Sequence, residues 1–557
     1  MALTFGPRLG RPSSTGFSVW VKADGASTIK VETRKTGTTA WTLKATQATG
    51  TWNSAALFVT GLDANTKYDY RVLQNDVQVA TNTTWTMPAS GRFFMYHVSD
   101  SHNVTDTLFD NIRVHFETHV EPLGIPAFIL HTGDLVGAAG GPHASATAMA
   151  DAFVAQYDDP FHRFFQTTAR LPFVYMFHDW DWAGNNSTYD WVTACTTRQV
   201  AVDHQAIHWQ DRGPCTFLGR TINGLPYDNY TFGFEVAGVP FLVIDERSEK
   251  KQGASDELPI WQGTEPRTLW QDDLRAWMRN WLVTNADRAL VMVAFGSTFR
   301  CPVVNVTSTT GGQAGAAARD GASIFHQQDL WDVFRACGES GLYSHTRKLV
   351  LLTGDDHSTW VHDGVITMPR RANDSTNVFP HPPPPGPVVP FREFKSNARS
   401  GEEALGFAIY GRGNVYDTQL ADPSANSFMV WDIDATAGGR YVTARAIITE
   451  SVDATPLVDE FGRTGDWWFD NGTWLTYDAD SAVVDQVYPG DGGYVSPPLF
   501  DTWSLDVVEG TMHPDRSMGR EPWERRLRAR ANFDTPSLDE QRAGWTVRVE
   551  ETDPDPE

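Results

Sequence analysis

The sequence predicts an α/β protein that carries a smaller, all-β sandwich at its N-terminus. Three observations support this fold class. Apolar runs with a period of two fill residues 1–88, and from about residue 92 short apolar runs alternate with helical stretches. The chain of 557 residues is also 41% hydrophobic, which is enough for sizeable cores, and this length corresponds to about two to four domains.

The N-terminal sandwich is predicted from short strands in which apolar side chains occupy alternate positions. Turn residues such as Asp24-Gly25 and Gly61 separate these strands, and this regular spacing is typical of β-sandwiches. Residues 61–70 resemble the corner of a fibronectin type III-like module. We expect residues 1–88 to act as a docking or spacer domain, with carbohydrate or surface binding as the alternative. The predicted strands cover residues 17–21, 29–32, 56–59 and 68–72.

The larger α/β domain is predicted to span residues 92–450. Residues 269–282 repeat apolar side chains at helical spacing and are expected to form a helix that faces the core. Strands that alternate with helices favour a layered α/β domain. Its strands are indicated by mostly apolar runs at 93–98, 127–130, 173–176, 241–244, 290–295, 348–352, 428–433 and 441–447.

The C-terminal extension, residues 451–557, reads as acidic, rich in tryptophan and loop-like. It contains no catalytic signature. We expect it to pack on the α/β domain.

The charge of the chain limits its partners. A formal net charge of −24 argues against a nucleic-acid scaffold role, because an acidic protein repels polyanions. A few of the carboxylates are expected to bind metal ions, which would in turn attract phosphate. No run of 18 or more apolar residues occurs, so no membrane span is predicted. The first residues also lack the apolar region of a signal peptide.

The cysteines carry little information. None of the four forms a CxxC pair, which disfavours a structural zinc site. Cys195 and Cys215 flank a polar stretch, and a disulfide between them and two buried free thiols are equally compatible with the sequence.

Four short segments share one design, an apolar strand followed by a carboxylate or an imidazole. Ligands gather beyond the carboxyl ends of strands in open α/β sheets, so we expect these strand ends to converge on one site. The spacing Asp-x-His lets two side chains bind one ion, and a glycine before a ligand aspartate allows a tight turn. The segments are residues 94–102, 128–134, 173–181 and 349–357.

The order of these motifs resembles the calcineurin-like metallophosphoesterase superfamily. The motifs are Asp100-x-His102, Gly133-Asp134, a third-strand motif, and Gly354-Asp355-x-His357. Together with the N-terminal sandwich, Asn185-Asn186 and residues 244–248, they resemble the PhoD-like alkaline phosphatase/phosphodiesterase family over roughly residues 5–450. The resemblance implies a four-layer β-sandwich flanked by helices, and a secreted or periplasmic location.

The resemblance also implies two metal sites. Asp134 would bridge both ions. The first site would contain Asp100, His102 and His357, and the second would contain Asp179 and Asp355. Mixed imidazole and carboxylate ligands suit iron, zinc or manganese, and all-oxygen ligands suit calcium, magnesium or manganese.

Departures from the family leave the general acid open. Trp180 occupies the place of the family's acid histidine, so His178 or water would protonate the leaving group. Residues 295–298 lie where the family has a further histidine. Asp181 either takes part in the chemistry or caps a loop, and Asn185 either binds phosphate or shapes a turn.

Three further residues are candidates for the site or for the core. Arg247 either pairs with Asp245 or binds the substrate phosphate in a bidentate manner. His97 and His131 lie inside predicted strands and are expected to be hydrogen-bonded core histidines.

The predicted function is metal-dependent hydrolysis of small phosphate mono- or diesters. A hydroxide shared by two ions about 3.5–4 Å apart would attack phosphorus in line, with no covalent enzyme intermediate. The alternatives are a broad phosphotriester or phosphonate hydrolase, and a non-catalytic metal-dependent binding protein.

Overall fold

The computed structural model describes most of the chain before residue 136 and a set of shorter segments after it. The long segments are 3–50, 53–101, 107–135, 230–247, 272–297 and 427–457. The others are 161–176, 178, 181, 220–222, 225–227, 270, 333–334, 337, 348–354, 360–366, 389–396, 463–471, 473–478 and 483–487.

Two antiparallel sheets form the N-terminal domain. The first has the order β1-β2-β5 and the second has the order β4-β3-β6-β7. Apolar side chains of both sheets, such as Val19 and Val31, share one core, which confirms the strands predicted here from period-two patterns. The strands are β1 (Leu3–Ser13), β2 (Gly16–Ala23), β3 (Thr28–Lys35), β4 (Thr42–Ala48), β5 (Ser54–Val59), β6 (Lys67–Gln74) and β7 (Val77–Trp85).

An eight-stranded sheet follows, with the order β10-β9-β8-β19-β20-β21-β22-β23. Its first three strands are parallel, and β19 joins β8 in antiparallel fashion. The bounds are β8 (Gly91–Val98), β9 (Ala127–His131), β10 (Phe173–Tyr175), β19 (Phe428–Ala435), β20 (Val442–Thr449), β21 (Arg463–Asp470), β22 (Thr473–Asp478) and β23 (Val483–Val487).

A six-stranded sheet has the order β13-β14-β15-β16-β18-β17. Its four inner strands are parallel, and the two edge strands run antiparallel to their neighbours. The bounds are β13 (Phe232–Val236), β14 (Val239–Val243), β15 (Val291–Ala294), β16 (Leu349–Thr353), β17 (Trp360–Ile366) and β18 (Val389–Lys395). A separate hairpin contains β11 (Arg220–Ile222) and β12 (Leu225–Tyr227).

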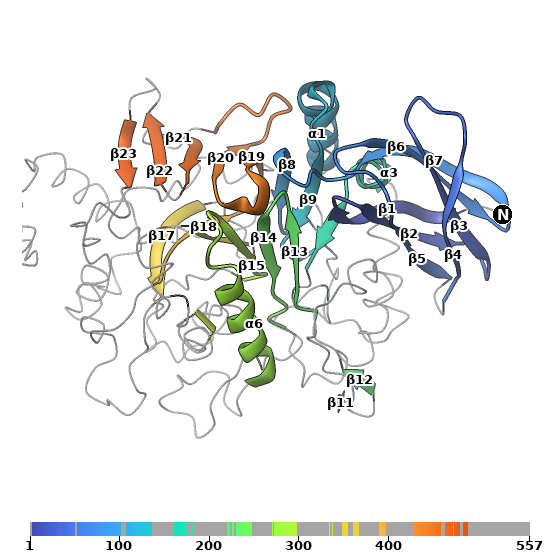
Figure 1. Ribbon diagram of the computed structural model, residues 1–557, viewed down its shortest axis with the longest axis horizontal. Coiled ribbons are helices and arrows are strands. Elements are labelled where there is room, and N and C mark those ends of the chain that lie inside the picture. Colours follow the sequence, from blue (N-terminus) through green and yellow to red (C-terminus); the bar gives the residue numbers. More distant parts are fainter. Residues whose placement is uncertain are drawn as a thin grey trace, which may run out of the picture.

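The two large sheets share a core, and helices cover their other faces (Figure 1). Phe128, Met292 and Trp431 belong to the core that both sheets contribute to. Helices α1 (Thr107–His115) and α3 (Phe161–Thr168) pack with β8–β10, and α6 (Asp272–Thr284) packs with β14–β16. Short helical turns are η1 (Phe116–Val120), η2 (Glu121–Leu123) and η4 (Ala437–Gly439). The helix predicted over 269–282 therefore corresponds to α6.

The structure of the residues after 451 contradicts the prediction of a loop-like extension. Strands β21–β23 continue the eight-stranded sheet through the pairing of β21 with β20. Trp467 and Phe469 point into the shared core while Trp468 is exposed, and this alternation is the signature of a strand. Trp467 and Trp474 are therefore core residues.

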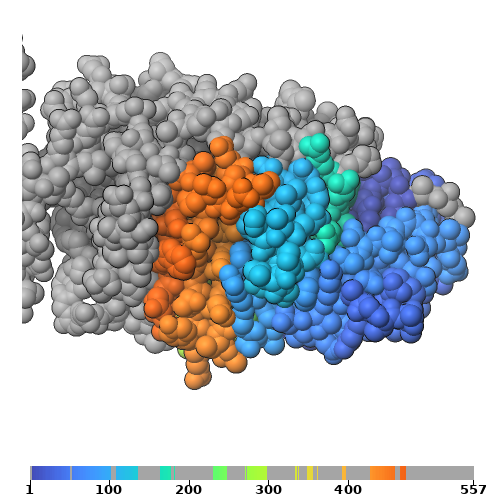
Figure 2. Space-filling view, turned by 90° about the horizontal axis from the view of Figure 1, so that it is seen from above, coloured from blue at the N-terminus to red at the C-terminus, as the bar shows by residue number. Residues whose placement is uncertain are grey.

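The N-terminal domain packs against β10 and α3 through β1, and its surface adjoins that of the following residues in Figure 2. Arg8 is fully buried, and its guanidinium carbon lies 5.0 Å from the ring centroid of Trp20 and 5.7 Å from that of Phe173. The Tyr70 hydroxyl donates a 2.7 Å hydrogen bond to the carbonyl oxygen of Ala169. These contacts support the docking role expected for residues 1–88.

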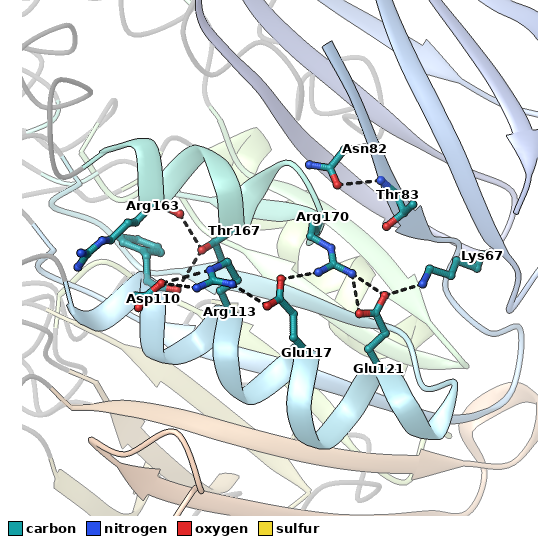
Figure 3. Close-up of polar contacts among 11 residues, drawn as sticks. Lys67, Asn82, Thr83, Asp110, Arg113, Glu117, Glu121, Arg163, Thr167 and Arg170 are labelled. Atoms are coloured by element: carbon teal, nitrogen blue, oxygen red, sulfur yellow. Dashed lines mark hydrogen bonds and ion pairs between the residues drawn. The ribbon is translucent and has the colours of Figure 1, made fainter.

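A chain of alternating charges extends from this contact along α1 (Figure 3). Lys67 of β6 lies 2.8 Å from Glu121, which accepts two 2.6 Å hydrogen bonds from Arg170. Arg170 also donates to Glu117, and Arg113 donates to Glu117 at 2.6 Å. Each carboxylate thus has more than one cationic neighbour. A network of this kind contributes more to stability than isolated surface ion pairs do.

The described helices include none that is long and apolar enough to span a bilayer. Cys337 is buried, and burial raises the pKa of its thiol to about 12. Cys195 and Cys215 lie outside the described residues, so the disulfide remains a prediction.

Two buried histidines predict a pH dependence of stability. Burial lowers the pKa of His97 to about 3 and that of His115 to about 4. Between about pH 6.5 and about pH 4 the unfolded chain binds protons that these imidazoles do not, so the free energy of unfolding falls with the pH. For each unit by which the pH falls in this range, each histidine lowers the free energy of unfolding by up to about 1.4 kcal/mol.

Urea midpoints at about pH 7 and about pH 5 measure this loss. The His115→Asn variant keeps an acceptor for the Tyr96 hydroxyl, which lies 2.8 Å from His115 Nδ1. It should lose less stability over this interval than the unmodified chain. Equal losses in the two proteins would contradict the assignment.

Candidate functional site

Asp100 and Asp134 follow neighbouring parallel strands at the same edge of the eight-stranded sheet. The strands β8 and β9 pair Val98 with His131. Both aspartates are buried and adopt left-handed backbone conformations, with φ angles of 53° and 57°. Such a conformation costs a non-glycine residue about 1–3 kcal/mol and is concentrated at functional sites.

Backbone hydrogen bonds join the two strand ends. The amide of Asp100 donates to the carbonyl oxygen of Gly133 at 3.0 Å, and that of Thr132 donates to Val98 at 2.9 Å. Asp100 therefore contacts the residue directly before Asp134, as the predicted convergence of these two segments requires.

The end of β16 reaches the same place from the other sheet. A Cβ atom at Gly354 would lie only 1.8 Å from Ser99 Oγ and 2.9 Å from the carbonyl oxygen of Thr132. Only glycine allows this approach. The residue before Asp355 thus contacts the residue before Asp100.

The third segment contributes His178, whose side chain is fully buried. Its Nδ1 lies 3.1 Å from Asp134 Oδ1, and its Nε2 lies 3.0 Å from Ser297 Oγ and 2.5 Å from Nη2 of Arg247. Its ring is held between two glycines. Cβ atoms at Gly133 and Gly296 would lie 2.5 Å and 2.3 Å from atoms of this side chain.

Asp181 organises the backbone of the site. Its Oδ2 accepts hydrogen bonds from the amides of Asp134 at 2.7 Å and of His178 at 3.0 Å. These contacts match the loop-capping alternative considered for Asp181. A direct part for Asp181 in the chemistry remains a prediction.

Arg247 follows β14 and is fully buried. Its amide donates to Asp245 Oδ1 at 3.0 Å, and its Nη2 lies 3.3 Å from Ser297 Oγ. The side chain of Glu246 accepts a 2.6 Å hydrogen bond from the amide of Ser297. The guanidinium therefore contacts His178 and Ser297, and its predicted contact with a phosphate remains a prediction.

Sequence reasoning missed Glu246 and Ser297 as parts of this cluster. Both follow strands, β14 and β15, in the same way as the four selected segments. The carboxylate of Glu246 matches that design and could have been identified by it, whereas the hydroxyl of Ser297 does not match it.

Several predicted site residues are not described. His102, Asp179, Asn185, Asp355 and His357 lie outside the described residues, so their roles stay predictions. Within the described part, no group of three or more His, Cys, Asp or Glu is arranged to hold a metal ion.

His97 and His131 are confirmed as hydrogen-bonded core histidines. Both are fully buried. His97 Nε2 lies 3.1 Å from Thr132 Oγ1, and His131 Nε2 lies 2.7 Å from Ser101 Oγ. These contacts orient Ser101, which directly follows Asp100, and Thr132, which lies two residues before Asp134.

Comparisons with known proteins identify the fold and one domain. A family model described as a domain of unknown function, DUF7800, matches residues 1–92. No curated protein matches the chain. A solved structure of PhoD is similar at 15% identity and a TM-score of 0.55, over 91% of this chain and 97% of that one.

Two other solved structures are more distant. A purple acid phosphatase from yellow lupin (Lupinus luteus) seeds is 11% identical over 81% of this chain and 73% of its own, with a TM-score of 0.47. GAP50, the anchor in the inner membrane complex of Plasmodium, is 10% identical over 75% of this chain and 95% of its own, with a TM-score of 0.28. Neither likeness carries an inference, whereas the match to PhoD shows that this sheet-rich chain shares the PhoD fold.

Proposed function

We propose that this chain is a metal-dependent phosphoesterase of the PhoD-like alkaline phosphatase/phosphodiesterase family, acting on small phosphate mono- or diesters. The observation that carries the proposal is the pair of buried, left-handed aspartates, Asp100 and Asp134, at the ends of adjacent parallel strands. The fold shared with PhoD supports it. A four-layer arrangement and a fibronectin type III-like N-terminal domain belong to the same proposal.

The described residues fit a cation site by their chemistry. Buried carboxylates are costly unless they are paired, hydrogen-bonded or bound to metal ions. Among the described residues around the site, five acidic side chains accompany one guanidinium, that of Arg247. The five are Asp100, Asp134, Asp181, Asp245 and Glu246, all buried. This excess of negative charge favours cations there.

Asp134 would bridge two ions in the proposed site. Asp100, His102 and His357 would hold the first, which is iron, zinc or manganese. Asp179 and Asp355 would hold the second, which is calcium, magnesium or manganese. Such ions, when bound, supply a hydroxide near neutral pH and neutralise charge that develops on the phosphoryl oxygens.

The chain's own residues would orient the substrate and exclude water. Gly133 before Asp134 accepts a hydrogen bond from the amide of Asp100, and Gly354 lies against Ser99, so these glycines let the strand ends approach closely. Arg247 and Asn185 are the candidates for binding the phosphate oxygens. Solvent would protonate the leaving group, because both ring nitrogens of His178 contact protein side chains.

Elemental analysis of protein purified without added metal tests the proposal directly. We expect two bound ions per chain, together with hydrolysis of p-nitrophenyl phosphate, bis-p-nitrophenyl phosphate or both. Turnover of phosphotriesters or phosphonates alone would favour the broader hydrolase. Bound metal without hydrolysis of any ester would indicate a binding protein, and protein without bound metal would end the proposal.

A further inference from the structure

The contacts of His178 identify which of its nitrogens carries the proton. Arginine has only donors, so Nη2 of Arg247, 2.5 Å away, requires an acceptor at Nε2. The proton of the neutral ring then lies on Nδ1 and is donated to Asp134 Oδ1 at 3.1 Å.

Glu246 points to the opposite assignment, because its Oε1 lies 3.3 Å from the same Nε2. The Arg247 contact is shorter. Glu246 Oε1 accepts its shorter hydrogen bond, 2.6 Å, from the Ser297 amide. The hydroxyl of Ser297, 3.0 Å from Nε2, can turn to donate to it. The contacts therefore favour a ring that accepts at Nε2 and donates at Nδ1.

The ring also has little freedom to move. Gly133 precedes Asp134, Gly296 precedes Ser297, and each leaves just enough room for one side of the imidazole. These two glycines belong to turns after β9 and β15, which lie in different sheets. His178 is thus held between the two sheets, with one nitrogen facing Asp134.

We propose that His178 is a positioning residue that fixes the orientation of the Asp134 carboxylate, rather than the acid that protonates the leaving group. A histidine whose two nitrogens are both engaged by protein side chains is poorly placed to give a proton to a substrate. Groups that orient metal ligands typically alter metal affinity by about 10–100-fold. This inference rests on the proposed function, since it concerns the same site.

Binding of Mn²⁺ and the choice of leaving group together test the proposal. One variant is His178→Ala, which removes the contacts of both ring nitrogens. The other is His178→Asn, whose amide can replace Nδ1 as the donor to Asp134. The matched control is His115→Asn, which alters a buried histidine of α1 that contacts Tyr96 of β8. Each protein is titrated with Mn²⁺ and assayed with p-nitrophenyl phosphate and phenyl phosphate.

For His178→Ala we expect Mn²⁺ affinity about 10–100-fold weaker, with activity on both esters reduced by the same factor. His178→Asn should recover most of the affinity, and His115→Asn should bind Mn²⁺ normally. If His178→Ala does not fold, Ser297→Ala should show a smaller loss of affinity in the same direction.

Two results would overturn the proposal. One is unchanged Mn²⁺ affinity in the folded variants of His178 and Ser297. The other is a loss confined to phenyl phosphate, whose poorer leaving group depends more on an acid. Wild-type protein that binds Mn²⁺ without cleaving esters would contradict the proposed function alone, because the Mn²⁺ titration still decides the role of His178. Wild-type protein that binds no Mn²⁺ would end the proposal for His178, whereas elemental analysis for the other metals still decides the proposed function.

Discussion

The Asp134→Asn variant is expected to lose turnover by at least about 1,000-fold while keeping its fold. Asparagine removes the charge that the proposed site requires at its bridging position, yet it has nearly the same shape. It also tolerates a left-handed backbone better than most residues, so the φ angle of 57° at this position carries no new penalty. Steady-state kinetics with p-nitrophenyl phosphate and far-ultraviolet circular dichroism measure the two halves of this prediction.

Asp76→Asn is the matched control. Asp76 has a φ angle of 68° and lies in the turn between β6 and β7. It is exposed and pairs with Lys30. The same change of atoms in the same backbone conformation should leave activity unaltered there. Near-normal turnover in Asp134→Asn would show that the bridging assignment is wrong.

The Gly133→Ala variant is expected to be among the most destabilised single substitutions in the chain. The φ angle of 105° at Gly133 is unfavourable for alanine, and its new Cβ atom would lie 2.5 Å from the Cβ of His178. Backbone strain costs about 1–3 kcal/mol and overpacking about 1–3 kcal/mol, so we expect a loss of about 2–6 kcal/mol. Thermal and urea unfolding measure this loss.

Gly91→Ala separates the two contributions. Gly91 has a similar φ angle of 99°, but a Cβ atom there would meet no atom within 4 Å. This variant should show the backbone strain without the steric clash. Equal destabilisation of the two variants would mean that the ring of His178 moves aside at little cost, which would also weaken its proposed positioning role.

The sequence predicted most strands because a buried strand requires a run of apolar residues that is visible in the sequence itself. The apolar runs at 127–130 and 348–352 correspond to β9 and β16, and residues 269–282 correspond to α6. The prediction of a loop over β21 is wrong, because Trp467 and Phe469 are buried while Trp468 between them is exposed. The glycine- and aspartate-rich surroundings of β21 obscured that alternation.

The site was only partly predictable. The aspartates after β8 and β9 could be selected because parallel neighbours end at one edge. The contacts of His178 could not, since Ser297 and Arg247 follow strands of the other sheet. A sequence gives the order of strand ends along the chain, but it does not state how two separate sheets face each other.

The pairing of β8 with β19 affects how the protein acquires its site during synthesis. Arg92 of β8 forms a two-pronged ion pair with Asp432 of β19, 340 positions further along the chain. Such distant contacts carry a large loop-closure cost and form slowly. The strand that carries Asp100 therefore acquires its second neighbour only after most of the polypeptide has left the ribosome. An incomplete chain would leave that edge of β8 open to pairing with other molecules.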